Sequence, residues 1–234
     1  MNTSHIISIT DPTIPLPLDV MFDMSKPLEI EIGCGNGRFL STRASTHRDI
    51  NYIGIERMLG RVRKLDRKAI RLQLDNLRIL RLEAFYTFYY LLPAHAVQTV
   101  YVFFPDPWPK RRHNHNRLLS SRFLDTLWMR LAHGGIIQIA TDHKDYFEQI
   151  MTVFGSAPRF RSVPAMERSP DEQTEFEQGF RSQGLPIYGC AFQAIEDLPE
   201  IPLPPLEIPD DMLPREGDDA PKDDAGFFSE EPPL

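Results

Sequence analysis

Residues 28–37 of the chain read Leu-Glu-Ile-Glu-Ile-Gly-Cys-Gly-Asn-Gly. The first five residues are predicted to form a β-strand that carries acids at Glu29 and Glu31. The three glycines end that strand, and because glycine has no Cβ they let the backbone approach a ligand closely. Residues 38–46 then have the composition of a helix. A strand, a glycine turn and a helix in succession form the start of a βαβ unit.

The alternation of strands and helices continues toward the C-terminus. Further strands are predicted at 52–55, 77–80, 97–104, 136–140, 159–163 and 187–194, and further helices at 58–74, 85–92, 120–131 and 144–154. The helix at 120–131 is expected to end at His133-Gly134-Gly135, because glycine commonly terminates helices. Strands that alternate with helices of roughly 10–15 residues indicate βαβ units. The sequence therefore predicts an α/β fold of the Rossmann-like kind, with a mostly parallel seven-stranded sheet and helices on both faces.

The composition of the 234-residue chain is that of one globular domain. Hydrophobic residues make up 41% and charged residues 25%, and no apolar run approaches the roughly 18 residues of a membrane span. We find no secretory signal, and the two cysteines have no partners at metal-binding spacing, so we expect a cytoplasmic protein with no membrane and no metal. We expect an N-terminal extension at 1–26, the domain at 27–198, and a disordered, acidic and proline-rich tail at 199–234.

The negative net charge of the chain hides a basic region. The net charge is −7, but residues 199–234 hold eleven acidic and two basic residues, which leaves a net charge of +2 on residues 1–198. Between residues 57 and 81 there are nine Lys and Arg residues against two Asp residues. Such a basic surface is compatible with binding to a phosphate backbone. For the run at 57–71, a helix face that is merely solvated is an equally good explanation.

Glycines or acids directly follow five of the predicted strands. They are Gly33–Gly37, Glu56, Glu83, Asp106 and Asp142. In a parallel sheet, ligands bind at the edge where the carboxyl ends of the strands meet. We therefore expect these five features to lie at one edge of the sheet and to share one site.

The glycine turn favours S-adenosylmethionine as its ligand. Its glycines are spaced G-x-G-x-G rather than G-x-G-x-x-G, and Glu31 stands two residues before the first glycine. A carboxylate there would repel the pyrophosphate of NAD, whereas it suits the cationic sulfonium and ammonium groups of S-adenosylmethionine. Glu56 is placed to accept hydrogen bonds from both ribose hydroxyls, and Glu83 to reach the adenine edge. The alternatives are an outward-facing strand residue for Glu31, a helix cap for Glu56 and a surface acid for Glu83.

Residues 103–110 read Phe-Phe-Pro-Asp-Pro-Trp-Pro-Lys. The three prolines remove backbone donors and fix a stiff loop, which holds Asp106 and Trp108 beyond the end of a strand. Trp108 could stack on a base or simply wedge the loop. The cations at and after the end of this stretch are expected to contact phosphates: Lys110, Arg111, Arg112 and Arg117. The alternative is a surface loop followed by a solvated basic run.

Two further acidic segments also have a structural explanation. Asp142 could face the substrate or cap the helix that begins near Lys144. Thr174-Glu175-Phe176-Glu177 has the Thr-x-x-Glu pattern of a capping box. From the pattern alone, capping is the favoured role of this second segment.

Several of these motifs occur together in a known combination: residues 28–37, Tyr-Ile-Gly-Ile-Glu at 52–56, Phe-Pro-Asp-Pro-Trp-Pro-Lys at 104–110, Gly134-Gly135 with Ala-Thr-Asp at 140–142, and Thr-Glu-Phe-Glu at 174–177 followed by Leu-Pro-Ile-Tyr at 185–188. In this combination the chain resembles the TrmB family, the tRNA (guanine-N7)-methyltransferases of the class I S-adenosylmethionine-dependent superfamily. The resemblance covers roughly residues 26–194. It implies a class I methyltransferase fold, with residues 27–198 as the methyltransferase domain.

The resemblance also implies roles for residues by their position. Cofactor contacts fall on Glu31, Glu56, Glu83 and Asp106, in addition to Gly33 and Gly35 of the glycine turn, and substrate contacts fall on Lys110, Asp142, Thr174, Glu175, Phe176 and Glu177. Asp106 also takes the position regarded as catalytic. The chain departs from the family pattern where Glu83 replaces an aspartate, where His115 and Asn116 replace two cations, and in its acidic tail.

The implied reaction is transfer of a methyl group from S-adenosylmethionine to N7 of a guanine in tRNA, at position 46 of the variable region, by a monomer or homodimer. Guanine N7 exposes a lone pair, so positioning rather than proton removal should supply most of the acceleration. We therefore expect Asp106 to accept hydrogen bonds from the guanine or the cofactor. Two alternatives are a methyltransferase that acts on an exocyclic amine of a nucleobase and a catalytically inactive RNA-binding relative.

Overall fold

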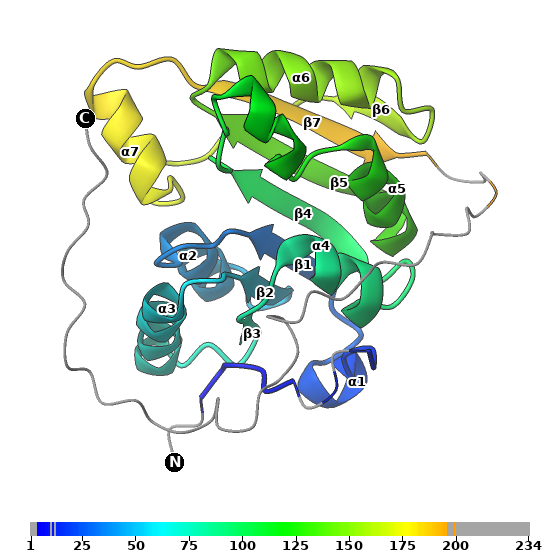
Figure 1. The fold of residues 1–234 in the computed structure, drawn as a ribbon. Coiled ribbons are helices and arrows are strands. Elements are labelled where there is room, and N and C mark those ends of the chain that lie inside the picture. The colour runs from blue at the N-terminus through cyan, green and yellow to red at the C-terminus, as the bar shows by residue number, and fades with distance from the viewer. Residues whose placement is uncertain (1–3, 10, 12, 196–198, 200–234) are drawn as a thin grey trace.

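Seven strands form a single sheet in the computed structural model, which describes residues 4–9, 11, 13–195 and 199 (Figure 1). The strands are β1 (Leu28–Ile32), β2 (Asn51–Ile55), β3 (Leu77–Leu80), β4 (Val97–Phe103), β5 (Leu131–Thr141), β6 (Phe160–Val163) and β7 (Tyr188–Ala194). Their order is β3-β2-β1-β4-β5-β7-β6, and β7 runs antiparallel to both of its neighbours while the other neighbouring strands are parallel. The expected α/β fold is confirmed. The tail expected to be disordered lies outside the described residues, apart from Pro199.

The helices cover both faces of this sheet. They are α1 (Leu18–Met21), α2 (Arg38–Thr46), α3 (Leu59–Leu72), α4 (Ala84–Tyr86), the π-helical turn η1 (Thr87–Leu91), the 3-10 turn η2 (Arg111–Asn116), α5 (Ser121–Arg130), α6 (Lys144–Gly155) and α7 (Glu175–Ser182). In Figure 1, α2 and α3 lie on one side of the strands, α5 and α6 lie on the other, and α7 stands beside α2. The aromatic segment predicted as a helix at 85–92 is a short α-helix that continues as a π-helical turn.

The two faces of the central strands differ in chemistry. Along β1, the apolar residues Ile30 and Ile32 enter the large core that also contains α5 and α6, whereas Glu31 lies on the opposite face. That opposite face carries a small aromatic cluster in which Phe39 of α2 packs on Tyr101 and Phe103 of β4. Acidic and aromatic side chains therefore lie together on the face that α2 covers, next to the carboxyl ends of the strands.

The predicted end of the helix at 120–131 is wrong. Helix α5 ends at Arg130, and Leu131 is already extended, so His133, Gly134 and Gly135 lie inside β5. The glycines serve an irregularity in the pairing with β4, where the register shifts between Val97 and Thr99. Gly134 has a φ of +69°, and a Cβ on Gly135 would lie 2.9 Å from the carbonyl oxygen of Ala132. A glycine pair marks a positive φ or a close backbone approach, which a bulge requires as often as a helix end.

Gly37, the residue before α2, is expected to be the least replaceable residue of the glycine turn. Its φ is +69°, and an added Cβ would lie 2.2 Å from Cδ1 of Leu65, a fully buried residue of α3. We expect Gly37→Ala to lower the free energy of unfolding by about 3 kcal/mol, because left-handed alanine costs about 1–2 kcal/mol and overpacking adds about 1–3 kcal/mol. Unfolding in urea would measure this change.

Gly33→Ala is the matched control for this variant. Gly33 has a similar φ of +73°, but among the described residues no heavy atom outside Gly33 and its two chain neighbours lies within 4 Å of its added Cβ. It should therefore lose only the backbone contribution of about 1–2 kcal/mol. Equal losses in the two variants would show that contact with Leu65 contributes nothing.

Candidate active site

The glycine turn between β1 and α2 folds against the end of β2. The backbone N–H groups of Gly33 and Cys34 donate to the carbonyl oxygen of Ile55 at 2.8 and 3.1 Å, and the N–H of Gly37 donates to the carbonyl of Cys34 at 2.8 Å. Gly33, Gly35 and Gly37 all have positive φ, which L-residues with a side chain rarely adopt. The turn is therefore fixed by backbone hydrogen bonds. Its three glycines have no side chains that would keep a ligand from the backbone at the carboxyl edge of the sheet.

Glu56 ties this turn to the start of α3. Its Oε2 accepts a hydrogen bond from the N–H of Gly35 at 3.0 Å, and its Oε1 accepts one from the N–H of Met58 at 2.9 Å. Arg61 stands 3.9 Å from the same carboxylate, which is only 7% exposed. Glu56 thus does act on the helix that follows it, as one interpretation of the sequence held. It also holds the glycine turn, and a carboxylate has lone pairs left for a further donor.

A cavity of about 250 Å³ lies under the glycine turn. Its wall includes Glu31, the glycine turn, Phe103 at the end of β4, and the first residues of α7. Glu31 is 2% exposed, and its Oε2 is a buried oxygen with no hydrogen-bond partner among the described residues. Burial raises the pKa of Glu31 to about 8, repulsion by Glu56 adds to the rise, and attraction to Arg168 opposes it. A buried carboxylate oxygen without a partner among the described residues is a site that a cationic ligand would fit.

The segment 174–177 contributes both a helix cap and part of this cavity. The Thr174 side chain accepts a hydrogen bond from the N–H of Glu177 at 3.0 Å, so the capping pattern is confirmed. Thr174, Glu175 and Phe176 line the cavity, and Glu175 accepts a hydrogen bond from the side chain of Asn36 in the glycine turn at 2.9 Å. Glu177 is fully buried and instead pairs with two arginines. The structure therefore brings three of these four residues to the glycine turn.

Glu83 lies just after the end of β3, the strand next to β2, and does not line the cavity under the glycine turn. It caps α4, because its side chain accepts a hydrogen bond from the N–H of Tyr86 at 2.7 Å.

The loop after β4 lies on the other side of β1, since Ile32 of β1 pairs with Val102 of β4 in parallel. Asp106 in this loop is exposed, and no described residue forms a hydrogen bond with its carboxylate. Its carboxylate is thus free to bind a ligand at the same edge as the glycine turn.

The loop of residues 104–110 is held in a strained conformation. Phe104 and Trp108 have φ of +54° and +43°, which is uncommon for residues with bulky side chains. Phe104 packs on Phe180 of α7, with ring centroids 5.4 Å apart, whereas Trp108 remains 37% exposed. Lys110 is also exposed. The contact between Phe104 and Phe180 links the loop that carries Asp106 to the helix that borders the cavity.

The expectation that Arg117 contacts phosphates is wrong. Its side chain is 1% exposed, and it donates to the carbonyl oxygen of Pro107 and to Asp145, both at 2.7 Å, and to the side chain of Gln149. Its guanidinium also lies 4.8 Å from the centroid of the Tyr146 ring. Burial raises the pKa of Tyr146 to about 12, and the nearby Asp106 carboxylate adds to this rise. Arg117 is therefore an internal support for the loop that carries Asp106.

Asp142 does not cap α6, because its neighbour His143 does so. The side chain of His143 accepts a hydrogen bond from the N–H of Tyr146 at 3.3 Å. Asp142 follows the last residue of β5 and no described residue hydrogen-bonds to its carboxylate, so it too can bind a ligand.

Among the described residues, no group of three or more His, Cys, Asp or Glu side chains could hold a metal ion, and no helix is long and apolar enough to span a membrane.

Sequence reasoning missed the two arginines that pair with Glu177. Arg168 donates from Nε to Glu177 at 2.6 Å, and Arg181 donates from its terminal nitrogen at 2.8 Å. The pair of Glu177 and Arg181 has the i,i+4 spacing of a helix ion pair, so that spacing was an available signal. Arg168 gives no such signal, because the irregular segment before α7 brings it to the helix.

A seven-stranded sheet in this order, with an antiparallel β7 and a glycine turn after β1 followed by an acid after β2, defines a class I methyltransferase. The crystal structure of the 16S rRNA methyltransferase KamB has the same fold, with a TM-score of 0.58 at 14% identity over 76% of this chain and 92% of that chain. The chain belongs to the TrmB family: the family model described as "Putative methyltransferase" matches residues 25–190. The resemblance found in the sequence is confirmed.

Relatives within this family carry a more specific name. The tRNA (guanine-N(7)-)-methyltransferase of Nitrosospira multiformis is 34% identical over 183 residues, which is 76% of this chain and 79% of the relative. A protein of the same name from Lactobacillus johnsonii is 34% identical over 78% of this chain and 88% of the relative. The similarity thus spans most of both proteins.

Proposed function

We propose that the protein transfers a methyl group from S-adenosylmethionine to N7 of a guanine in tRNA, at position 46 of the variable region. The observation that carries the proposal is the buried Glu31 oxygen without a partner in the cavity under the glycine turn. The acceptor follows from the activity named for relatives that are 34% identical over three quarters of the chain. The basic face of α3 supports an RNA acceptor, because Lys64, Arg67 and Arg71 are exposed there.

The residues of the cavity, together with Glu56, which holds the glycine turn from outside the cavity lining, fit the proposed cofactor. Glu31 offers a carboxylate to a cationic amino-acid moiety, the backbone of Gly33 and Gly35 allows close approach, and Glu56 can accept hydrogen bonds from ribose hydroxyls. Glu83 would reach the adenine from the end of β3 if it gave up its cap of α4. When bound, S-adenosylmethionine supplies an electrophilic methyl group on a sulfonium.

The acceptor side of the site requires residues that orient a guanine. N7 already carries a lone pair, so the protein does not need to remove a proton from it. Asp106 and Asp142 follow β4 and β5, which pair directly, and neither carboxylate has a hydrogen-bond partner among the described residues. We assign Asp106 the role of accepting hydrogen bonds from the N–H groups of the guanine Watson–Crick edge. Lys110, Asp142 and Thr174 to Phe176 complete the proposed contacts with the substrate, and fully buried Glu177 acts through the arginines that it holds.

Asp106→Asn is expected to lower kcat/KM for tRNA about 10- to 100-fold, because an amide is a weaker acceptor than a charged carboxylate and hydrogen bonds to charged groups contribute about 1.5–3 kcal/mol. Its thermal stability should not fall, since no described residue hydrogen-bonds to the carboxylate of Asp106. Asp19→Asn on the exposed part of α1 is the matched control and should be unchanged. Wild-type turnover and guanine selectivity in Asp106→Asn would remove this role from Asp106.

Methyl transfer from labelled S-adenosylmethionine to unmodified tRNA, followed by nucleoside analysis, tests the proposed function directly. The expected product is 7-methylguanosine. A methyl group on an exocyclic amine would favour the alternative enzyme. Failure to bind S-adenosylmethionine in calorimetry would favour the inactive RNA-binding relative.

A further inference from the structure

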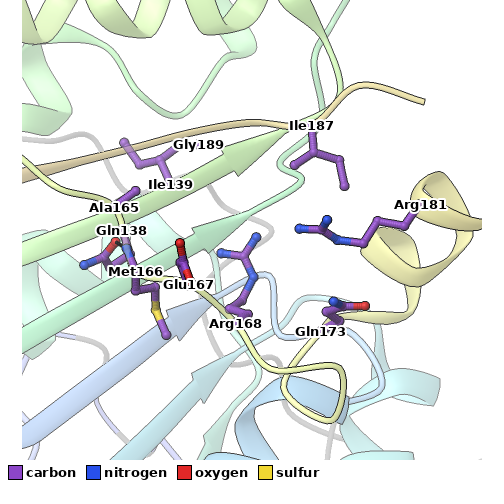
Figure 2. A pocket seen from close by; sticks show the side chains of 10 residues that line it. All are labelled: Gln138, Ile139, Ala165, Met166, Glu167, Arg168, Gln173, Arg181, Ile187 and Gly189. Carbon is purple, nitrogen blue, oxygen red and sulfur yellow. Dashed lines mark hydrogen bonds between the residues drawn. The ribbon is translucent and has the colours of Figure 1, made fainter. Parts of the chain in front are cut away.

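A second cavity, of about 410 Å³, is lined by the segment that leads into α7 (Figure 2). Gln138 of β5, Gly189 of β7 and Arg181 of α7 belong to its lining, together with the segment 165–168. Gln138 lies two residues before Ala140, so it shares the face of the sheet that carries the aromatic cluster. Over β5 and β7 this face is covered by the connection between β6 and β7 rather than by a long helix, which leaves room for the cavity.

Arg168 presents a buried guanidinium to this second cavity. Its side chain is 8% exposed, its Nε donates to Glu177 at 2.6 Å, and its guanidinium carbon lies 4.2 Å from the centroid of the Phe103 ring. No hydrogen bond with a described residue uses its two terminal nitrogens. In Figure 2 the guanidinium groups of Arg168 and Arg181 point toward each other across the cavity.

One buried carboxylate, that of Glu177, holds both arginines. Glu177 is fully buried and accepts from Nε of Arg168 at 2.6 Å and from Nε and a terminal nitrogen of Arg181 at 3.0 and 2.8 Å. Both arginines line the cavity, and no described residue accepts a hydrogen bond from the terminal nitrogens of Arg168 or from the second terminal nitrogen of Arg181. Glu167 also lines the cavity, but its side chain is exposed and solvent screens its charge. Glu177 binds Nε of Arg168 and one side of the Arg181 guanidinium, which leaves other N–H groups of each arginine for a ligand. Two guanidinium groups held in this way are a typical binding site for a phosphate.

The position of this cavity indicates which phosphate it would bind. Ile187 in its wall precedes Tyr188, which pairs with Thr141, so the cavity reaches the point where Asp142 leaves β5. Phe103 connects the two cavities, because it lines the first cavity and its ring contacts Arg168, which lines the second. A nucleotide that reaches the glycine turn from the side of β5 would therefore place its backbone beside Arg168 and Arg181.

We propose that Arg168 and Arg181 bind a phosphodiester of the RNA substrate next to the target guanosine. This inference rests on the proposed function, and it assigns the second cavity to the sugar–phosphate backbone rather than to the base. Glu177 fixes both guanidinium groups before RNA arrives, so little side-chain freedom is lost on binding.

Arg181→Gln in the full-length chain tests the proposal. Arg181 is 54% exposed and its loss leaves Glu177 paired with Arg168, so the variant should fold. We expect its Kd for unmodified tRNA to rise about tenfold, with a slope of log Kd against log salt that is smaller by about one. The affinity for S-adenosylmethionine and kcat at saturating tRNA should stay unchanged. Arg48→Gln is the matched control, because Arg48 is 45% exposed and its side chain donates to the carbonyl oxygens of Leu72 and Gln73, away from the cavity.

A second arm identifies the source of the phosphate. The tRNA is prepared with neutral methylphosphonate linkages on both sides of the target guanosine. These linkages should weaken binding to the wild type about tenfold and should not weaken binding to Arg181→Gln any further. Losses that add independently in the variant would overturn the proposal, as would an Arg181→Gln protein that binds like the Arg48→Gln control.

Inorganic phosphate provides the last comparison. If it raises the melting temperature of the wild type but not of Arg181→Gln, while neutral linkages weaken both proteins equally, the cavity binds a free anion and the assignment to RNA is wrong. Failure of the proposed function has a different outcome, because the wild type would then transfer no methyl group to tRNA. Efficient methylation of tRNA combined with additive losses would reject the phosphodiester site alone.

Discussion

Glu31→Gln is expected to weaken binding of S-adenosylmethionine about hundredfold and, at the same time, to stabilise the ligand-free protein at alkaline pH. Both effects have one cause. The Glu31 carboxyl is buried, and one of its oxygens has no partner among the described residues. An ionised carboxylate in that position is unfavourable until a cation binds beside it. A neutral amide of the same shape avoids this cost but cannot attract the cation.

The dependence of stability on pH follows from the raised pKa. Because the folded protein keeps a proton on Glu31 up to a pKa of about 8, whereas an unfolded Glu loses it near 4.5, the free energy of unfolding falls as the pH rises between these values. The loss is complete above about pH 8 and amounts to roughly 3–5 kcal/mol for a shift of this size. Glu31→Gln removes it, so the variant should gain stability over the wild type from pH 5 to pH 9 in urea unfolding.

Cofactor binding provides a second measurement of the same group. At pH 7 a cationic ligand would shift Glu31 to its ionised form, so binding should release close to one proton and the affinity should rise with pH until about pH 8. Calorimetry in buffers with different ionisation enthalpies would count the protons. Binding to Glu31→Gln should release none.

Glu29→Gln is the matched control for Glu31→Gln. Glu29 lies on the same strand and on the same face of the sheet, but it accepts a hydrogen bond from the Tyr101 hydroxyl at 2.8 Å and pairs with Arg43 at 3.4 Å. Its replacement should destabilise the protein and leave proton release unchanged. If Glu31→Gln lost stability in the same way, or bound S-adenosylmethionine as the wild type does, the assignment of Glu31 to the cofactor would fail.

Arg117→Met is expected to lower stability by about 3 kcal/mol and turnover about hundredfold. The stability is lost because the substitution removes a buried arginine that supports Pro107, Asp145 and Gln149. The turnover is lost because the loop of residues 104–110 would no longer fix Asp106, and a displacement of about 1 Å can cost about 100-fold in rate. Cofactor affinity should be preserved, since Arg117 does not line the cavity under the glycine turn.

Asp145→Asn separates the two parts of this prediction. Asp145 is 69% exposed and is only one of the three groups that Arg117 supports. Its substitution should lower stability by less than about 1 kcal/mol and should leave turnover near that of the wild type. If Arg117→Met kept normal turnover in a folded protein, the loop would not need this support and Arg117 would have a purely structural role.

The sequence predicted the sheet and its edge well, because both depend on local signals. Apolar runs mark β1 to β5, and the glycines and acids that follow them mark the ends of the strands. The parallel arrangement then places these ends together without further information. The end of α5 was predicted incorrectly, because Gly134 and Gly135 serve the pairing of β5 with β4.

The sequence could not show which arginines of the chain are exposed and which are buried. Arg112 and Arg117 stand in the same basic run, yet Arg112 is exposed and Arg117 is buried. The difference arises from α6, whose Asp145 and Gln149 lie far along the chain and receive Arg117. Arg168 was missed for a similar reason, because only the fold brings Glu177 and Phe103 to it. A sequence shows which residues are charged, but only the fold shows which partners bury a charged side chain.

The N-terminal segment has a consequence for the behaviour of the protein at high concentration. β3 is an outer strand, and His5 and Ile7 form backbone hydrogen bonds with both polar groups of Ile79 at 2.9 and 2.8 Å, while Asp66 of α3 holds Ser4 and His5. An open strand of this kind is a template on which a second molecule can add its own strand. Residues 5–7 occupy that template, and they therefore protect the β3 edge of the sheet against edge-to-edge aggregation.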